Sequence, residues 1–80
     1  ACHDLISALH AQAIGCDAIL LSPVLPTATH PDARPLGWEQ FAQIAKQFDI
    51  PVFALGGMTP ERLTDVQHHH GYGIAGARFL

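Results

Sequence analysis

Basic side chains are scarce in this sequence. Seven acidic residues outnumber four basic ones, which gives a formal net charge of -3 over 80 residues. The four basic residues are scattered along the chain: Arg34, Lys46, Arg62 and Arg78. No basic patch therefore follows the phosphate backbone of DNA or RNA, and we expect no nucleic-acid partner.

Long apolar runs and cysteines are also few. No hydrophobic run approaches the roughly 20 residues needed to cross a bilayer, so we expect no membrane span. Cys2 and Cys16 have no second pair of cysteines and follow no signal peptide, which favours reduced thiols in a cytoplasmic protein. The sequence starts without Met inside what looks like structured sequence, so we expect part of a longer polypeptide.

Helical patterns occur three times. Asp4 can cap a helix over residues 5–14, where apolar residues recur at helical spacing before Gly15. A second helix is expected over residues 38–48, and a third begins at Pro60, a residue favoured at the first helical position. The apolar residues expected on these two helices are Phe41, Ile44, Phe48, Leu63 and Val66.

Short apolar runs separate the helices. Residues 18–21 are a continuous apolar run, which is typical of a strand buried on both faces of a parallel sheet. Residues 52–55 predict the next strand and residues 74–77 a last short one. Between the first two strands, residues 23–37 hold four prolines and show no periodicity. A segment of that length without periodicity favours a ligand-side loop over a plain connector.

The alternation of strands and helices predicts an α/β fold. Parallel strands joined by helical crossovers form either an open doubly wound sheet or an eight-stranded barrel, and both bind ligands at the carboxyl ends of their strands. A closed barrel takes about 250 residues, so 80 residues cannot close one. Either a preceding segment supplies the missing strands, or copies of the chain associate as a homo-oligomer.

Two glycines follow the strand expected at residues 52–55. Gly56 and Gly57 have no Cβ, so a ligand can approach the bare backbone there. The helix that begins after Thr59 would point its free N–H groups toward the same place, as in many phosphate sites. The alternative is a simple tight turn.

Three segments carry a resemblance: residues 1–4 (ACHD), 21–30 (LSPVLPTATH) and 54–60 (ALGGMTP). They resemble the carboxyl half of the thiamine phosphate synthase family and its thiazole tautomerase branch, which is a TIM barrel. With LGW at 36–38 and IAGAR at 74–78, the chain is similar to the barrel fused behind a Nudix hydrolase domain of the 8-oxo-dGTP diphosphatase type. Residues 1–80 would then be a barrel half with a Nudix-type domain or further strands upstream.

The resemblance assigns His3 to the end of the fifth strand, where the tautomerase branch uses a histidine as acid and base. Alternation along a strand agrees, because it puts Ala1 and His3 on one face and Cys2 on the other. Imidazole can take and return a proton near neutral pH, as a 1,3-proton shift on a thiazole carboxylate phosphate requires. The alternative is a strand-end histidine that only forms hydrogen bonds.

Further residues match family positions that bind phosphate. Thr27 and Thr29 match a loop that reaches the diphosphate and the thiazole, although a threonine beside proline also stiffens a turn. Gly56 and Gly57 match the phosphate loop after the seventh strand.

The chain also departs from the synthases, which typically carry Ser in place of Ala1 and Lys in place of His30. A hydroxyl donor and a permanent charge for diphosphate are thereby lost. Arg78 would restore a charge, or it is simply solvated. The metal ligands and pyrimidine pocket of the family belong to the amino-terminal half, so no cofactor is expected within this segment and Mg²⁺ would bind upstream.

Two other groupings have simpler explanations. His68, His69 and His70 lie about 100° apart on a helix and cannot converge on one metal ion, so a solvated helix end is favoured. Cys2 and His3 face opposite ways on a strand and do not make a nucleophile and base. Trp38 is expected in the core of the second helix.

Three functions remain open. The first is a barrel domain of thiamine biosynthesis that binds a phosphorylated small molecule, tautomerase-like or synthase-like. The second is a non-catalytic barrel remnant attached to a Nudix-type hydrolase. The third is an assembly piece whose strand edges pair between copies.

Overall fold

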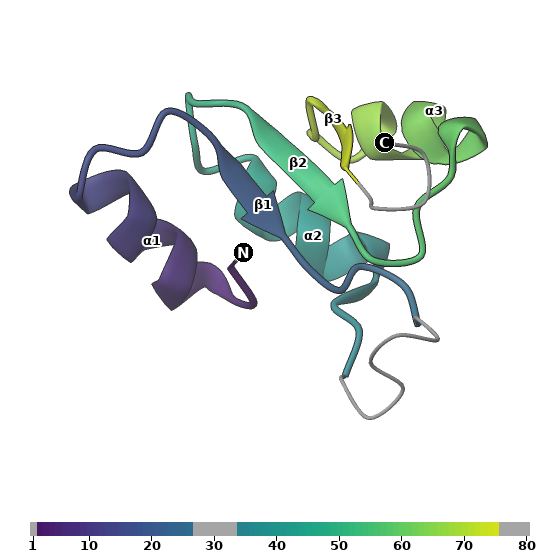
Figure 1. Ribbon diagram of the computed structural model, residues 1–80, viewed down its shortest axis with the longest axis horizontal. Coiled ribbons are helices and arrows are strands. Elements are labelled where there is room, and N and C mark those ends of the chain that lie inside the picture. Colours follow the sequence, from purple (N-terminus) through teal and green to yellow (C-terminus); the bar gives the residue numbers. More distant parts are fainter. Residues whose placement is uncertain (1, 27–33, 76–80) are drawn as a thin grey trace.

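The computed structural model describes residues 2–26 and 34–75. The elements in chain order are α1 (Leu5–Ala13), β1 (Ile19–Leu21), α2 (Gly37–Ala45), β2 (Val52–Leu55), the 3₁₀ turn η1 (Pro60–Arg62), α3 (Leu63–His68) and β3 (Gly73–Ala75) (Figure 1). Within these described ranges, no helix is long and apolar enough to cross a membrane.

The three strands form one parallel sheet in the order β1-β2-β3. Ile19 lies beside Val52, and Phe53 lies beside Gly73. Cys2 adds a fourth strand position, since it forms a parallel bridge with Leu21 on the other side of β1. Strands that are neighbours in both sequence and space are typical of a barrel, whereas a doubly wound sheet reverses its strand order.

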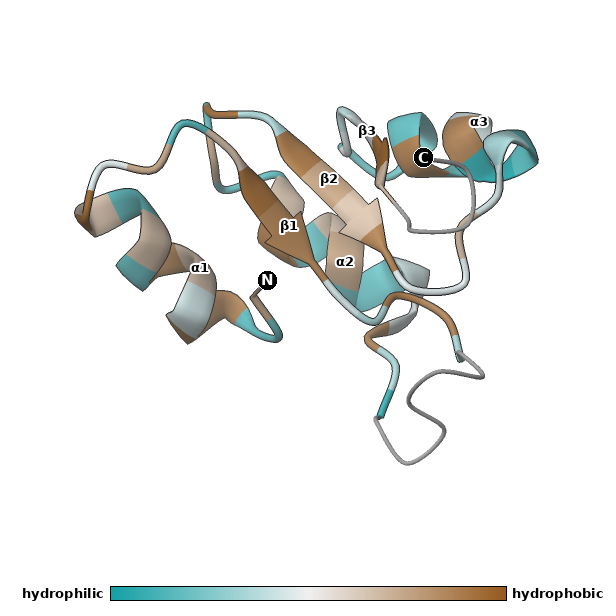
Figure 2. Ribbon diagram, viewed as in Figure 1, coloured by the Kyte–Doolittle hydropathy of each residue, from teal (hydrophilic) through white to brown (hydrophobic). Residues whose placement is uncertain are grey.

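The core lies between the sheet and its helices. In Figure 1, α2 lies behind β1 and β2, and none of the described helices covers the side of these strands that faces the viewer. Figure 2 shows that these two strands are among the most hydrophobic parts of the chain. The buried side chains on the helix side are Ile19, Leu21, Val52, Ala54, Phe41, Ile44 and Ala45. Leu20 points the other way and is 39% exposed, so the expected burial of both faces is wrong for this chain.

Helix α1 begins and ends where the sequence predicts. Asp4 caps it by accepting a hydrogen bond from the Ser7 amide at 2.8 Å, and Gly15 follows with φ = 89°. Ala8 is fully buried and Leu5 packs against the core, but Ile6 is 79% exposed and lies outside the core. Much of the apolar pattern that predicts this helix therefore faces away from the sheet.

The Asp4 cap makes the stability of α1 depend on pH. The backbone hydrogen bond from Ser7, followed by one from its side chain, lowers the pKa of Asp4 below 3.8. A lowered folded-state pKa stabilises the fold above the unfolded value and loses that effect as the pH falls through the folded value. We expect thermal unfolding, followed by circular dichroism, to shift downward between pH 6 and pH 3.

Asp4→Asn keeps a capping oxygen without a titrating charge, so we expect it to show a smaller acid-induced shift. Asp17→Asn is the control, because Asp17 is exposed and lies outside the helix. Equal acid sensitivity of the Asp4→Asn variant and the unchanged chain would contradict this account.

Helix α2 is shorter than expected and ends at Ala45 instead of residue 48. The chain continues in a tighter turn, with hydrogen bonds from Gln47 to Ile44 and from Phe48 to Ala45. Phe48 still packs in the core at 9% exposure, because the turn keeps it on the inner side. The 3₁₀ turn η1 has Pro60 in its first positions and leads into helix α3, which buries Val66 and begins at Leu63, three residues later than predicted.

Gly71 lies where the end of α3 meets α2. Its amide donates a hydrogen bond to the Val66 carbonyl at 2.9 Å. A Cβ at this position would overlap Val66 Cγ1 and lie 2.9 Å from two ring atoms of Phe41. Both neighbours are fully buried, so neither has free space to move into.

Candidate functional site

The carboxyl ends of three neighbouring strands meet at one edge of the sheet. His3 follows Cys2, Ser22 follows β1 and Gly56 follows β2. The strands are parallel, so these positions lie side by side at the edge toward which the arrows of β1 and β2 point in Figure 1.

His3 lies on the open side of this edge. Cys2 packs against the core while the His3 side chain is exposed, which confirms the predicted alternation for these two residues. His3 Nδ1 lies 2.8 Å from the carbonyl oxygen of Ser22. A carbonyl oxygen only accepts, so Nδ1 donates, and Nε2 of the neutral ring keeps a free lone pair. The ring is thus held in the tautomer that can accept a proton at Nε2.

Ser22 positions His3 through its backbone. Its amide donates to the Cys2 carbonyl at 2.9 Å, its own carbonyl accepts from His3, and its side chain is buried. The Ser22–Pro23 peptide bond is cis. This role of Ser22 leaves no signal in the residue pattern, because a backbone carbonyl is present at every position.

The loops after β1 and β2 are joined to each other. The Val24 amide donates to the Leu55 carbonyl at 3.0 Å, and the Leu25 amide donates to the Gly56 carbonyl at 3.2 Å. These bonds fix the start of the proline-rich loop against the glycine pair. The two loops therefore behave as one backbone unit at the carboxyl edge.

The base of the proline-rich loop is closed on itself. Leu36 donates to the Pro23 carbonyl at 2.7 Å, and Gly37 donates to the Val24 carbonyl at 2.9 Å. The segment that follows β1 and the segment that precedes α2 are thus hydrogen-bonded to each other. This closure holds the start of α2 at the carboxyl edge of the sheet.

Gly56 and Gly57 both adopt the left-handed conformation, with φ = 99° and 70°. A Cβ on Gly57 would lie 2.9 Å from Leu25 Cβ and 3.1 Å from the Pro26 carbonyl oxygen. Glycine is therefore required here by the neighbouring loop, which supports the tight-turn explanation independently of any ligand. The same lack of side chains leaves the backbone bare, as the phosphate hypothesis needs.

The segment after the glycines differs from expectation. Thr59 makes no capping hydrogen bond with its side chain, and the helix starts as the 3₁₀ turn η1. A hydrogen bond from the Thr59 side chain instead lowers the pKa of Glu61. The regular α-helix begins only at Leu63 and has six residues, so it is a weaker source of aligned N–H groups than the sequence suggests.

Gly57→Ala is expected to lower the free energy of unfolding by roughly 1–3 kcal/mol more than Gly15→Ala. Both substitutions place a side chain at positive φ, but a Cβ at Gly15 meets nothing within 4 Å. Urea unfolding of the two variants separates the steric effect of Leu25 and Pro26 from backbone strain. Equal losses of unfolding free energy in both variants would show that contact with Leu25 and Pro26 adds nothing to the cost.

Five of the residues named from the sequence lie outside the described residues: Ala1, Thr27, Thr29, His30 and Arg78. Of the predicted site, the structure therefore places His3, Gly56 and Gly57, all at the same edge. Two open hollows, of about 380 and 200 Å³, lie elsewhere. They are lined by Leu36, Glu39, Gln40 and Gln43, and by Thr64, Gln67 and His68.

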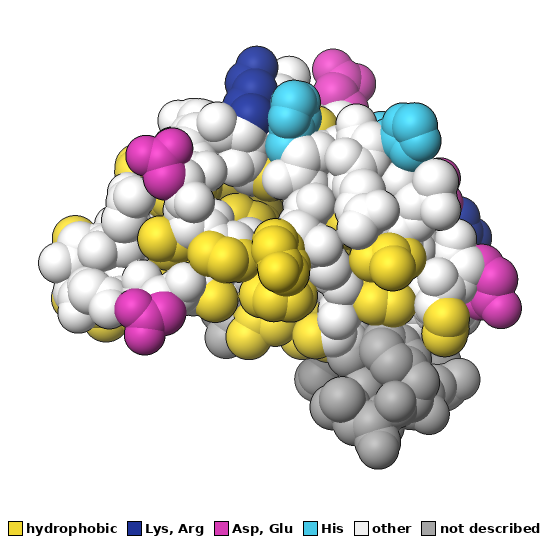
Figure 3. Space-filling model, turned by 90° about the horizontal axis from the view of Figure 1, so that it is seen from above, with side chains coloured by type: hydrophobic (Ala, Val, Ile, Leu, Met, Phe, Trp, Pro, Cys, Tyr) yellow, Lys and Arg dark blue, Asp and Glu magenta, His cyan; other side chains and the backbone are white. Residues whose placement is uncertain are grey.

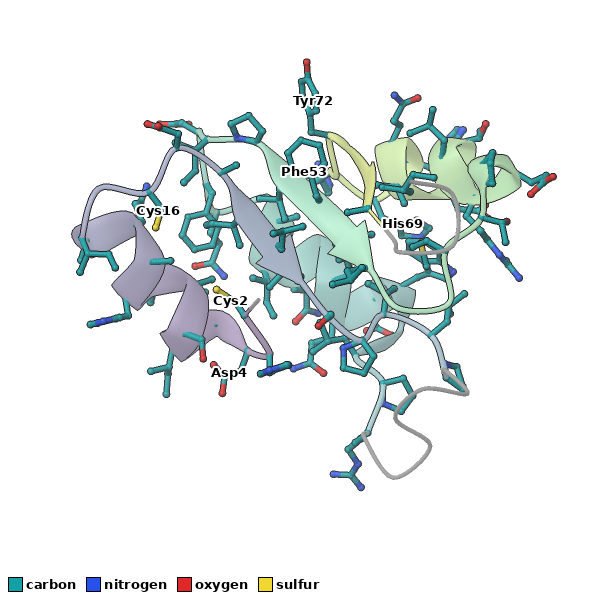
Figure 4. All side chains as sticks on the ribbon, viewed as in Figure 1. Cys2, Asp4, Cys16, Phe53, His69 and Tyr72 are labelled. Carbon is teal, nitrogen blue, oxygen red and sulfur yellow. The ribbon has the colours of Figure 1, made fainter. Side chains whose placement is uncertain are left out.

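Of the three histidines expected at a solvated helix end, His68 and His70 are exposed, but His69 is half-buried. The ring of His69, which is labelled in Figure 4, stacks on Trp38 with centroids 5.0 Å apart, and its Nδ1 donates to the Asp65 carbonyl at 2.6 Å. Trp38 also meets Phe41 edge to face, which confirms its place against the core. Across residues 2–26 and 34–75, no three His, Cys, Asp or Glu side chains are grouped as a metal site would require.

Both cysteines are free thiols. Cys2 is half-buried and Cys16 is exposed, and Figure 4 shows them near opposite ends of α1. The structure therefore contains no disulfide between them.

Comparisons with known proteins agree on one family. The family described as thiamine monophosphate synthase matches residues 1–80. The chain is 42% identical over 74 residues to "Putative thiamine-phosphate synthase 2" of Aquifex aeolicus, which covers 92% of this chain and 40% of that protein. It is 35% identical over 74 residues to the thiamine-phosphate synthase of Chloroflexus aurantiacus, covering 91% of this chain and 34% of that protein.

A solved structure has the same fold. The thiamine phosphate pyrophosphorylase from Pyrococcus furiosus superposes with a TM-score of 0.78 at 31% sequence identity, over 95% of this chain and 36% of that one. The chain thus spans between about a third and two fifths of the length of these proteins. With its parallel strands in barrel order, it belongs to the thiamine monophosphate synthase family and has the fold of part of a TIM barrel.

Proposed function

We propose that this chain forms part of a cytoplasmic barrel domain that binds a thiazole phosphate, or a related phosphorylated small molecule, and isomerises it with His3 as acid and base. The observation that supports this most is the hydrogen bond from His3 Nδ1 to the Ser22 carbonyl. Because Nδ1 carries the proton in this bond, Nε2 is the nitrogen at which the neutral ring can accept one.

A tautomerase reaction fits this arrangement. A 1,3-proton shift on a thiazole carboxylate phosphate removes a proton at one atom and returns it at another, so one group must act first as base and then as acid. In the proposed reaction, Nε2 of His3 takes the proton, and the imidazolium that forms gives it back. The Ser22 carbonyl keeps its hydrogen bond to Nδ1–H throughout.

The phosphate of the ligand would lie against the bare backbone at Gly56 and Gly57, next to the loop whose Leu25 amide donates a hydrogen bond to the Gly56 carbonyl. We propose Thr27, Thr29, His30 and Arg78 as further phosphate contacts, on the family resemblance. Mg²⁺, where a synthase reaction needs it, would be held by the amino-terminal part of a complete barrel.

The test is turnover by the polypeptide that contains this segment. Incubation with the thiazole carboxylate phosphate, followed by proton NMR, is expected to show isomerisation that His3→Ala abolishes without loss of fold. Unchanged turnover in His3→Ala would reject the catalytic role. Phosphorus NMR titration separately tests binding, which is expected to survive in His3→Ala.

A second candidate function is a barrel remnant without catalysis, attached to a Nudix-type domain that hydrolyses nucleotide pyrophosphates. The replacement of the synthases' Ser and Lys by Ala1 and His30 favours it, because both changes remove groups that would bind diphosphate. Hydrolysis of 8-oxo-dGTP by the complete polypeptide, together with no thiazole isomerisation, would support this alternative over the first.

A further inference from the structure

A row of four residues crosses the sheet where its strands end. The strand register, continued one step beyond the last paired residues of the first two strands, places them side by side: His3, Ser22, Leu55 and Ala75. Neighbouring strands lie about 5 Å apart, so His3 and Ser22 can both reach one small group of a ligand. Of these four side chains, only those of His3 and Ser22 can form a hydrogen bond.

The side chain of Ser22 lies on the same face of the sheet as His3. Side chains alternate along a strand, and Leu21 is fully buried toward the helices, so Ser22 points to the opposite side, as Leu20 does. The strand pairing extends to Ser22, because its amide donates to the Cys2 carbonyl at 2.9 Å. The hydroxyl and the imidazole therefore share one side of the carboxyl edge.

Ser22 is a polar residue in apolar surroundings. It is 9% exposed, and within residues 2–26 and 34–75 it is the one buried residue with a polar or charged side chain. The same face of the sheet carries Leu20 and Phe53, and Figure 3, which looks down from the top of Figure 1, shows hydrophobic side chains gathered in the middle of the surface. A hydrogen bond is electrostatically stronger in such surroundings than in water. The hydroxyl of Ser22 would thus interact more strongly with a charge on a ligand than an exposed hydroxyl does.

We propose that the Ser22 hydroxyl is a second catalytic group of this site, which donates a hydrogen bond to the negative charge that develops on the substrate while His3 removes the proton. This inference rests on the proposed isomerase function. It adds a role for the side chain of Ser22 to that of its carbonyl, which orients His3.

The two groups divide the proton shift between them. A C–H bond of the substrate breaks, its proton forms an N–H bond at Nε2 of His3, and the electron pair moves into the conjugated carboxylate. The carboxylate oxygen that gains charge accepts the hydrogen bond from Ser22. The Nε2–H bond then breaks, a new C–H bond forms at the far end of the three-atom unit, and the oxygen returns to its initial charge.

The two roles of Ser22 are separable by mutation. Ser22→Ala removes the hydroxyl but keeps the carbonyl that accepts from His3 Nδ1 at 2.8 Å. We therefore expect ¹⁵N NMR of the His3 ring to show the proton at Nδ1 in this variant, as in the unchanged chain. A change in the position of that proton would mean that the hydroxyl acts only through His3, and would contradict a catalytic role.

The test is steady-state kinetics on the thiazole carboxylate phosphate with the polypeptide that contains this segment. Ser22→Ala is expected to lower kcat by about 10²-fold with little change in KM, because a donor to a developing charge acts mainly in the transition state. Ser22→Cys keeps a weak donor of similar shape and is expected to lose less, and it provides the test if Ser22→Ala does not fold. Thr64→Ala is the matched control, because it removes an exposed hydroxyl on α3 and should leave kcat unchanged.

Two kinetic results would overturn the proposal. One is a Ser22→Ala variant with the kcat of the unchanged polypeptide. The other is a rise in KM alone, which would mean that the hydroxyl only binds the substrate. Either result, together with a loss of kcat in His3→Asn, would leave the proposed isomerase function in place. No turnover by the unchanged polypeptide would reject both.

Discussion

Replacing His3 by asparagine is expected to lower the rate of the proposed proton shift by roughly 10²- to 10⁴-fold, the usual contribution of a general acid–base residue. The Asn amide can still donate a hydrogen bond to the Ser22 carbonyl, as Nδ1 does now at 2.8 Å. It lacks any group equivalent to the Nε2 lone pair. The variant thus keeps the local structure and removes only the base.

A comparison with His3→Ala decides between catalysis and a structural role. If His3 acts as the base, Asn and Ala variants lose the same activity, and kcat falls while KM changes little. If His3 only supports Ser22, Asn restores activity that Ala loses. His10→Asn is the control, because His10 is an exposed histidine in the last turn of α1, at the other end of that helix from His3. Steady-state kinetics with each variant gives the answer.

Gly71→Ala is expected to destabilise the fold by about 1–3 kcal/mol, the usual cost of forcing extra volume into a packed core. The added methyl group would overlap Val66 and press on the Phe41 ring, and both of those side chains are fully buried. For a domain of this size, each kcal/mol lowers the melting temperature by roughly 4–8 °C. Differential scanning calorimetry measures the shift.

The cause of that loss is tested by making room for the methyl group. In a Phe41→Leu background, which is itself less stable, we expect Gly71→Ala to cost less than in the unchanged chain. A double-mutant cycle on the unfolding free energies gives the coupling between the two positions. Additive losses would mean that the Phe41 ring is not the obstacle.

Local signals predicted most of the elements. Residues 52–55 form β2 as expected, because Pro51 and Gly56 bound the apolar run on both sides. Helix α1 agrees to within one residue, since Asp4 and Gly15 mark its ends. Helix α2 ends three residues early because the spacing of Phe48 suits a tight turn as well as a helix, and hydrophobic periodicity cannot tell them apart.

Contacts between distant segments could not be predicted in the same way. The left-handed φ of Gly57 suits any tight turn, but the approach of Leu25 to it joins segments more than 30 residues apart in the chain. The Ser22 carbonyl that orients His3 is a backbone atom and would be present with any residue there. The exposure of Ile6 could not be predicted either, because periodicity shows that a helix has an apolar side but not what covers it.

The hydrogen bonds between the loops after β1 and β2 use only main-chain atoms, from Val24 to Leu55 and from Leu25 to Gly56. Side chains take no part in these bonds, so a substitution in either loop that keeps the glycine at position 57 leaves the bonds in place. Mutation can alter which molecule is recognised while the anchor points persist, which makes this pair of loops a natural place to evolve or engineer a new specificity.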